Sequence, residues 1–562
     1  MPRPLHACLL LATGCSHPSV MIGPPPDDSE APAPDSEAPD DDDTGGAEHI
    51  PTSVLRPLFD PPPGGFSVHV EVTVTSSTGE GLVRACVTTP TEPCEPAPVT
   101  GPLSLTSSSI VIAEVNTDGA ASGPEAASYV RLSDDIAAFS SNLPVLVFWT
   151  DGAAPSSTTP VALGLDLFEP GEGRTHLTDP ATDSGRARLK TRGRSTAGVP
   201  KHSFDLELWQ ADSEADRPLE LLGMPEDGDW ILQAPYSFDD ALIRNALGFA
   251  LSNRIGRYAP RTRFAEVFVA EHGAALATSH FQGLYVVTEE IERGADRIDV
   301  TPIGPGDVAE PEVTGGYVFK RDRLGDGEVG MDVGLAGGAF SFLDPMVWVD
   351  PAEDEVVPAQ AAYLSGLVDE FAWAIVQPDF TNPTTGRHYG EIIDVDSWID
   401  HHILNVFIKN PDAFRLSGYM SKDREGPIVA GPLWDLDRTA GGNDTRCTDP
   451  TWWDAWNVTS DTTPYFTWAW YGALFEDPAF RERYWARWRE VLASELAIEV
   501  VLAEIDALAE PLPEAAARNS EAWYTPEFGG QIDALREWFT ARHAWITACL
   551  EQGGDPRECQ GG

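Results

Sequence analysis

Polar and apolar residues alternate strictly near the N-terminal end of the chain. Residues 66–133 are rich in Val, Thr, Ser and Ile, and the run from Phe66 to Thr75 repeats with a period of two. Successive side chains of a strand point to opposite faces, so this pattern predicts strands that are buried on one side. Turn signals recur at short spacing without a helical period, which predicts a small all-β sandwich over residues 63–133.

The pattern changes further along the chain. Residues 134–184 contain two apolar runs, at 143–149 and 161–168, which predict connecting strands that lead into a larger domain. Strands and amphipathic helices then alternate to about residue 340, and the period is mostly helical from residue 356 onward. The predicted fold class is α+β, with the sheet first and the helices later.

Two acidic motifs flank a predicted hairpin in the second half of the chain. Asn410-Pro411-Asp412 comes before residues 418–431, which read as strand, tight turn and strand, and Trp434-Asp435-Leu436-Asp437 comes after them. One carboxylate therefore lies in a loop before the hairpin and two lie at its far end. Phosphoryl-transfer enzymes need such a set, because one Asp orients the attacking hydroxyl and another holds Mg²⁺.

The paired aspartates predict a metal site. In a strand, Asp435 and Asp437 would share one face, with Trp434 and Leu436 packed on the other. Two carboxylates so close resist ionising together unless a cation lies between them, and Mg²⁺ takes few protein ligands. The alternative is an exposed Asp-x-Asp without a ligand, but the two apolar neighbours favour a half-buried segment, where unpaired carboxylates are costly.

The overall charge narrows the range of partners. The chain has 89 acidic and 37 basic residues, a formal net charge of -52. Nucleic acids and anionic membrane surfaces require clustered Lys and Arg, so neither is an expected partner. The acidity is compatible with cationic proteins or metal ions as partners. The alternative is that it only keeps the protein soluble.

The N-terminus predicts export. Residues 1–15 combine Arg3, a short apolar run and Ala-Thr-Gly-Cys ending at Cys15, which resembles the lipobox of bacterial lipoproteins. This implies a lipoprotein of the bacterial cell envelope, anchored to the membrane only through lipid on Cys15; the alternative is ordinary cleavage of the signal and a secreted product. Residues 16–62 include a Pro/Ala-rich acidic stretch without Lys or Arg up to residue 48, which predicts a disordered linker.

The remaining cysteines suit an oxidising compartment. Cys86 and Cys94 lie eight residues apart, and Cys549 and Cys559 lie near the C-terminus, so each pair is a candidate for a local disulfide. Cys447 is then left over.

Several motifs together resemble the spore-coat protein H (CotH) kinase family, a divergent branch of the protein-kinase fold. Their order along residues 185–552 carries the resemblance. They are Arg192-Gly193-Arg194-Ser195, Pro200-Lys201-His202-Ser203-Phe204, Leu221-Leu222-Gly223-Met224-Pro225, Asp229-Trp230-Ile231-Leu232, Ile243-Arg244-Asn245, Gly283-Leu284-Tyr285, Gly315-Gly316-Tyr317-Val318-Phe319-Lys320, and the two acidic motifs. The sandwich, from Val83 to Asn116, is similar to the β-sandwich module of chitobiase-type glycosidases.

The CotH resemblance implies an ATP- and Mg²⁺-dependent kinase that acts on proteins outside the cytoplasm. By position in the motifs, Asp412 resembles the catalytic base, Asp435 and Asp437 the metal pair, and Asn410 a residue that supports the metal or the catalytic loop. Three cations compete to contact the nucleotide phosphates, and Glu289 is expected to pair with whichever does so. These cations are Lys201, Arg244 and Lys320.

The chain departs from the family pattern at Arg194, where Asn is usual, and at Pro411, which stiffens its loop. One alternative is therefore a non-catalytic surface protein that uses a kinase-like scaffold. Another is sugar binding by the sandwich or by the tryptophans around Trp452-Trp453 and Trp468-Ala469-Trp470, which are more readily explained as core or groove packing. Residues 553–562 are expected to form a C-terminal tail.

Overall fold

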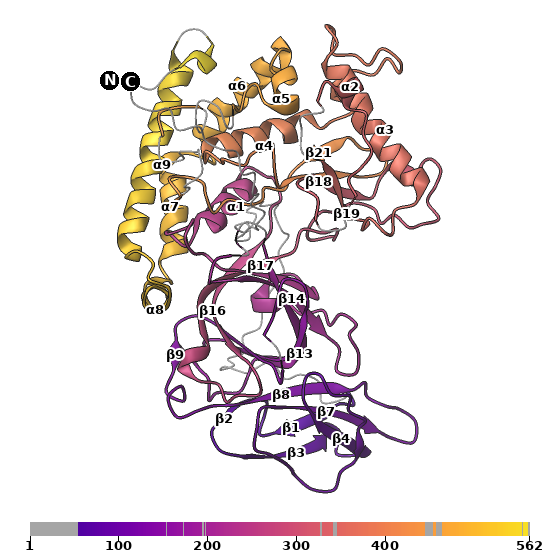
Figure 1. Ribbon diagram of the computed structural model, residues 1–562, viewed down its shortest axis with the longest axis vertical. Helices are drawn as coiled ribbons and strands as arrows, with labels where there is room; N and C mark the ends of the chain where they lie inside the picture. The colour runs from indigo at the N-terminus through magenta and orange to yellow at the C-terminus, as the bar shows by residue number, and fades with distance from the viewer. Residues whose placement is uncertain are drawn as a thin grey trace, which may run out of the picture.

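The fold consists of three parts arranged end to end. The computed structural model describes residues 54–152, 154–171, 173–193, 196, 198–325, 329–340, 345–443, 453–456, 464–552 and 555–559. Figure 1 shows a small β structure at one end, a barrel in the middle and a helical part with its own sheet at the other end. The predicted signal peptide with Cys15, most of the predicted linker, and Cys447 lie outside the described residues.

The N-terminal part is built from two sheets, with the strand orders β1-β3-β6 and β2-β8-β7-β4-β5. Its strands are β1 (Pro57–Asp60), β2 (Gly64–Phe66), β3 (Val70–Ser76), β4 (Leu82–Thr88), β5 (Ala97–Pro98), β6 (Leu103–Leu105), β7 (Ser109–Asn116) and β8 (Glu125–Arg131). Alternate apolar side chains such as Val72, Val111 and Tyr129 form a shared core. The predicted β structure is confirmed, and a disulfide joins Cys86 to Cys94. The predicted linker was too long, because β1 lies inside residues 16–62 and pairs with β3.

The middle part is a closed barrel with the strand order β10-β11-β13-β14-β15-β17-β16. The strands are β10 (Val145–Trp149), β11 (Val161–Phe168), β13 (Asp183–Arg192), β14 (Ser203–Trp209), β15 (Asp229–Gln233), β16 (Thr262–Ala270) and β17 (Phe281–Glu289). Neighbours are antiparallel except at the closure, where β10 pairs in parallel with β16. The prediction for residues 134–184 was wrong in one respect: β10 and β11 are not connecting strands but two of the strands that form the barrel. β9 (Ser140–Ser141) and β12 (Thr175–His176) form a separate small sheet.

The sandwich and the barrel share one hydrophobic cluster. Ile110, Val130 and Leu132 from the sandwich side pack with Val147 and Phe268 of the barrel. Asp166 of β11 is buried at this junction, and its Oδ2 accepts a hydrogen bond of 2.7 Å from Ser128 on β8. Burial raises the pKa of Asp166 well above its ordinary value, because a charge is poorly solvated there. The two β structures are therefore joined by a common core.

The third part combines a four-stranded sheet, in the order β19-β18-β20-β21, with helices. The strands are β18 (Tyr317–Arg321), β19 (Met346–Asp350), β20 (Gly418–Lys422) and β21 (Ile428–Ala430). The helices are α1 (Arg244–Arg254), α2 (Leu335–Gly338), α3 (Pro358–Ile375), α4 (Val395–Phe407), α5 (Ala469–Leu474), α6 (Pro478–Leu492), α7 (Ile498–Ala509), α8 (Pro513–Trp523) and α9 (Phe528–Glu551). β20 and β21 are the predicted hairpin.

Helix α8 connects the C-terminal end of the chain to the barrel. It packs on β17 at Gly283, where a Cβ atom would lie 2.5 Å from Asn519 Oδ1 and leave no room for a side chain. A second disulfide joins Cys549 on α9 to Cys559. Within the described ranges, no helix combines the length and the apolar character that crossing a membrane requires.

Candidate active site

The segment that carries the paired aspartates is not a strand. β21 ends at Ala430, and Asp435 has a φ of 65°, so the prediction that Asp435 and Asp437 share one face of a strand was wrong. The segment is held instead by α1, where Asn245 Oδ1 accepts a 2.7 Å hydrogen bond from Leu436 N. Gly248 gives Leu436 its space, because a Cβ at this position would lie 2.3 Å from Leu436 Cδ1. Packing against α1 therefore fixes this conformation.

Asp435 is a buried carboxylate surrounded by other acids. The residue is only 4% exposed. Burial raises its pKa well above the ordinary value of 3.8, and the charges of Asp437, Asp412 and Asp322 raise it further, while Arg438 opposes them. The charges of Asp437 and Asp412 thus both act on Asp435, and a cation there would relieve this repulsion.

Asp435 Oδ2 supports the same conclusion. This oxygen is buried and has no hydrogen-bond partner within the described part of the chain. A buried polar atom left in this way costs free energy unless a ligand satisfies it. Carboxylate oxygens are the ligands that Mg²⁺ prefers, so this residue pair suits the metal that the sequence predicted.

Asp412 lies in a loop directly after α4. Asp394 caps the start of α4 by accepting a 2.8 Å hydrogen bond from Ser397 N, and the chain leaves the helix after Phe407. Asp412 is buried, and Arg415 pairs with its Oδ1 at 2.6 Å. This pair fixes the direction of the carboxylate.

Asn410 builds the loop from inside. Its Nδ2 donates to Asn405 Oδ1 at 2.9 Å, and its Oδ1 accepts from Asp412 N at 3.0 Å. Tyr465 donates its hydroxyl to the backbone oxygen of Asn410 at 2.8 Å. Of the two roles predicted for Asn410, these bonds favour support of the loop.

Lys201 is buried between the barrel and α8, with 1% of its surface exposed. Its Nζ donates to Leu284 O at 2.6 Å, Asn519 Oδ1 at 2.8 Å and Pro235 O at 3.1 Å. Burial lowers the pKa of Lys201 well below its ordinary value of 10.5. With three protein acceptors, Lys201 acts as a structural link in this conformation.

Lys201 nevertheless lies near the aspartates. It lines a small pocket of about 30 Å³ together with Asn245, Gln233 and Asp437, so the barrel and the acidic segment share one cavity.

Arg244 and Glu289 have other partners than those predicted. Arg244 is buried at the start of α1, and both its Nη1 and its backbone N donate to Asp239 at 2.9 Å. Glu289 is fully buried and pairs with Arg261, through Nη1 at 2.5 Å and backbone N at 2.6 Å. The expectation that Glu289 pairs with a phosphate-binding cation was therefore wrong in this structure.

Lys320 is the third of the predicted cations. It projects from β18, and its Nζ is 3.5 Å from Asp322 Oδ2 and 5.5 Å from the ring centre of Tyr419. Asp322 in turn acts on Asp435. Lys320 thus pairs with a carboxylate whose charge acts on Asp435.

Sequence reasoning missed three charged residues of this region: Asp322, Glu290 and Arg438. Glu290 is the residue after Glu289; burial raises its pKa, while Arg192, Arg297 and Lys320 lower it. The available signal was that neighbouring residues of a strand point to opposite sides, so Glu290 would point away from the side of Glu289 at the end of β17. Asp322 follows Lys320 by two residues, which would have placed both on one face.

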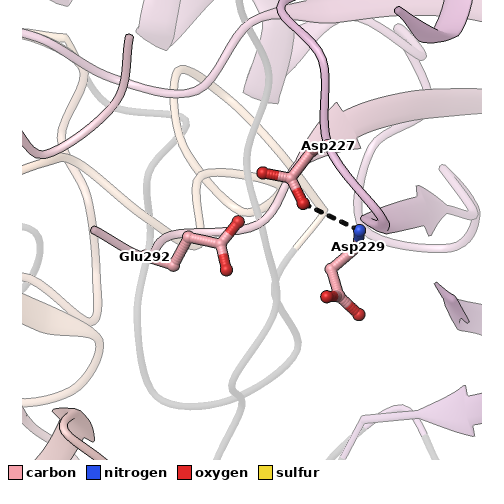
Figure 2. Close-up of side chains that lie close together, drawn as sticks. All are labelled: Asp227, Asp229 and Glu292. Carbon is pink, nitrogen blue, oxygen red and sulfur yellow. Dashed lines mark hydrogen bonds between the residues drawn. The ribbon is translucent and has the colours of Figure 1, made fainter. Parts of the chain in front are cut away.

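A second acidic cluster lies at the start of β15. Asp227, Asp229 and Glu292 bring three carboxylate oxygens within 4.8 Å of one another. Figure 2 shows these three side chains close together. Burial and four neighbouring carboxylates raise the pKa of Asp229 to about 7. Arg297 already pairs with Asp227 at 2.8 Å and with Glu292, so this cluster carries its own cation.

No set of three oxygens this tight includes Asp412, Asp435 and Asp437 in the described residues. A larger hollow of about 730 Å³ lies between α7, α8 and α9, and none of these three aspartates lines it.

The geometry defines a class of protein: a mixed α/β protein with a buried acidic site next to a cation. A family model described as CotH kinase protein matches residues 189–546, which is more than half of the chain and includes every predicted site residue. The chain belongs to the CotH kinase protein family, and the predicted resemblance is confirmed. No curated protein matches the chain.

Proposed function

We propose that this protein is an ATP-dependent protein kinase of the CotH type, which transfers the γ-phosphoryl group to hydroxyls of envelope or surface proteins outside the cytoplasm. One observation carries the proposal. Asp435 is buried among Asp437, Asp412 and Asp322, has a raised pKa, and presents an oxygen without a hydrogen-bond partner among the described residues. A site that gathers negative charge away from water is built to receive a cation.

The residues divide the work as follows. Asp435 and Asp437 would hold Mg²⁺, which when bound neutralises charge on the phosphates of ATP. Asp412 accepts the proton of the acceptor hydroxyl or orients that hydroxyl, and Arg415 holds its carboxylate in place at 2.6 Å. Lys320, which pairs with Asp322 at 3.5 Å, would attract phosphate oxygens.

Two features support action outside the cytoplasm. The Cys86–Cys94 and Cys549–Cys559 disulfides are typical of an oxidising compartment. The lipobox-like end at Cys15 and the acidic linker would then anchor the folded parts at a membrane and hold them away from it.

The test is phosphoryl transfer from labelled ATP by the mature chain, with and without Mg²⁺. Asp412→Asn and Asp435→Asn are each expected to lower kcat by about 100-fold or more, because they remove the proton acceptor or a metal ligand. Asp435→Asn should also abolish the thermal shift caused by Mg²⁺ and ATP, whereas Asp412→Asn should retain it. Asp166→Asn is the matched control, since Asp166 is equally buried with a raised pKa but lies at the junction of sandwich and barrel.

The non-catalytic alternative makes the opposite prediction. A wild-type protein that shows neither transfer nor a Mg²⁺-ATP thermal shift would overturn the proposal in favour of a kinase-like scaffold. Transfer at wild-type rates by both aspartate variants would overturn the assignment of the site.

A further inference from the structure

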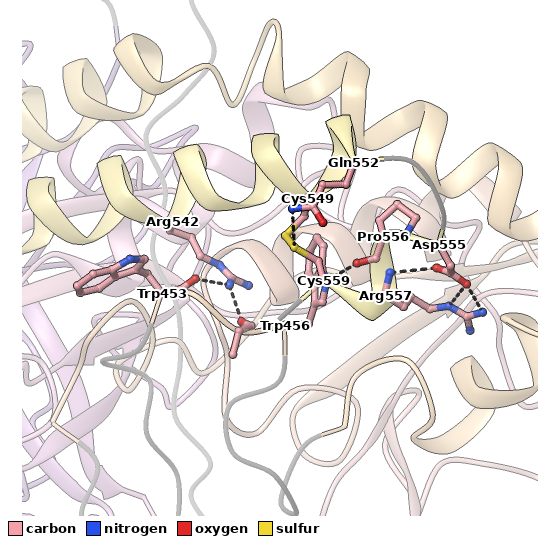
Figure 3. The surroundings of a disulfide bond; sticks show 10 residues. Trp453, Trp456, Arg542, Cys549, Gln552, Asp555, Pro556, Arg557 and Cys559 are labelled. Carbon is pink, nitrogen blue, oxygen red and sulfur yellow. Dashed lines mark hydrogen bonds and ion pairs between the residues drawn. A yellow bond between two sulfur atoms is a disulfide. The ribbon is translucent and has the colours of Figure 1, made fainter. Parts of the chain in front are cut away.

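A buried arginine lies behind the loop that carries Asp412. Arg542 is a residue of α9 and is fully buried. Its guanidinium donates to four backbone oxygens: Val406 O at 2.7 Å, Phe407 O at 3.3 Å, Trp453 O at 2.7 Å and Ala455 O at 2.6 Å. One side chain thus joins the end of α4 to the segment 453–456. Figure 3 shows Arg542 beside that segment.

Arg542 contacts α4 at its C-terminal end, which is where a cation stabilises a helix most. The last carbonyl groups of a helix lack intrahelical partners and carry partial negative charge, so a cation stabilises them. Val406 and Phe407 are the final residues of α4, and Asn410 and Asp412 follow within five residues. A shift of this helix end would therefore move the Asp412 carboxylate.

The opposite side of Arg542 is fixed by the C-terminal end of the chain. Trp456 donates its ring N–H to Pro556 O at 2.8 Å, and the ring of Trp456 lies 5.9 Å from the guanidinium carbon of Arg542. Pro556 begins a short 3-10 helix, Pro556–Glu558, and the next residue, Cys559, is bonded to Cys549 on α9. Figure 3 shows this sequence of contacts from the disulfide through Trp456 to Arg542.

Burial makes this arginine costly to keep. It lowers the pKa of Arg542 to about 9, and the hydrogen-bond acceptors given above are backbone oxygens, not carboxylates. A neutral side chain could fill the same volume without burying a charge. It would lose the planar guanidinium group, whose N–H groups donate to two separate segments at once.

We infer that Arg542 is a positioning residue for the Asp412 loop, and that the Cys549–Cys559 disulfide holds the segment 453–456 against it. The inference rests on the proposed kinase function for its effect on catalysis, but the effect on the loop is independent of any activity. The disulfide then matters to the site although it lies at the far end of α9.

Two variants test the inference in the mature chain: Cys549→Ser with Cys559→Ser, and Arg542→Lys. Each is expected to lower kcat about ten-fold or more while the KM for Mg²⁺-ATP stays within about two-fold, because the Asp412 loop is misplaced and the metal pair is not. The double variant Cys86→Ser with Cys94→Ser is the matched control. It removes a disulfide from the sandwich and should change neither constant.

Hydrogen exchange separates this inference from the proposed function. Amides of residues 407–412 should exchange faster in both test variants than in wild type, with no change in the control. Unchanged exchange there would overturn the inference, whether or not the protein transfers phosphate. If wild type shows no transfer but exchange changes as expected, the proposed function fails and the positioning role stands. The cysteine variant decides the matter if Arg542→Lys does not fold.

Discussion

At the scale of one residue, Asp435 illustrates how a carboxyl group that is buried among other acids opposes folding. Burial and neighbouring carboxylates raise its pKa well above 3.8, so the folded state holds this proton more tightly than the unfolded chain. Above the ordinary carboxyl pKa, the unfolded chain binds fewer protons than the folded one, and stability falls as pH rises toward the folded pKa. The charged carboxylate is therefore destabilising in the absence of a metal.

This gives a prediction for stability. Asp435→Asn should raise Tm by about 1–3 °C at pH 8 without divalent cations, and the gain should shrink toward pH 4, where the unfolded wild-type chain also begins to bind this proton. Mg²⁺ should reverse the order by stabilising wild type alone. Thermal melts at the two pH values, with and without Mg²⁺, measure this. A variant that melts below wild type at pH 8 without metal would contradict it.

The residue scale also shows what the sequence could and could not reveal about the site. The two acidic motifs were recognisable because a hairpin separates them, and the charge of Asp412 contributes to the raised pKa of Asp435. The phosphate-binding cation and its acidic partner were harder to predict, because several Lys, Arg and Glu residues occupy equivalent motif positions. Only the fold shows that Glu289 pairs with Arg261, while the charges of Arg192 and Lys320 act on Glu290.

At the scale of elements, α1 determines the shape of the Asp435 segment. An Asp-x-Asp pattern predicts alternation in a strand, but the contact of Leu436 with Gly248 requires another backbone path. Local periodicity could not anticipate this, since the contact joins residues distant in the chain. The hairpin of β20 and β21 was predictable for the opposite reason, because its turn and both strands are local.

Gly248 therefore makes a sharp test. Alanine favours a helix interior over glycine by up to about 1 kcal/mol, and Gly366→Ala in α3, where a Cβ would meet nothing within 4 Å, should show that gain. Gly248→Ala should instead lower stability and reduce phosphoryl transfer, since Leu436 must move. Chemical denaturation and transfer assays of the two variants measure the contrast. Equal stabilisation by both would show that Leu436 does not depend on Gly248.

At the scale of the whole molecule, the sandwich is less separate than its sequence pattern predicts. Composition marks a boundary near residue 133, yet Ile110, Val130 and Leu132 share a cluster with barrel residues. The parallel closure of the barrel by β10 and β16 also escaped prediction, because it pairs segments that more than one hundred residues separate. Long-range pairing of this kind leaves no local period.

The shared cluster predicts the behaviour of fragments. A chain that begins at residue 134 should expose apolar barrel residues such as Val147 and Phe268, and it should aggregate or melt well below a chain that begins at residue 54. Size-exclusion chromatography and thermal melts of the two fragments compare them. A monomeric fragment from residue 134 with an unchanged Tm would show that the sandwich is a separate domain.

The contact of α8 with the barrel has a consequence for how the protein is made. Asn519 Oδ1 accepts from both Lys201 Nζ and Leu284 N, so one side-chain oxygen near the end of the chain satisfies two donors in the barrel. During synthesis, a nascent chain that has reached residue 300 contains every barrel strand but lacks this acceptor. In a growing chain, Lys201 Nζ and Leu284 N therefore lack this acceptor until α8 has left the ribosome. A premature stop before residue 519 would remove the acceptor permanently.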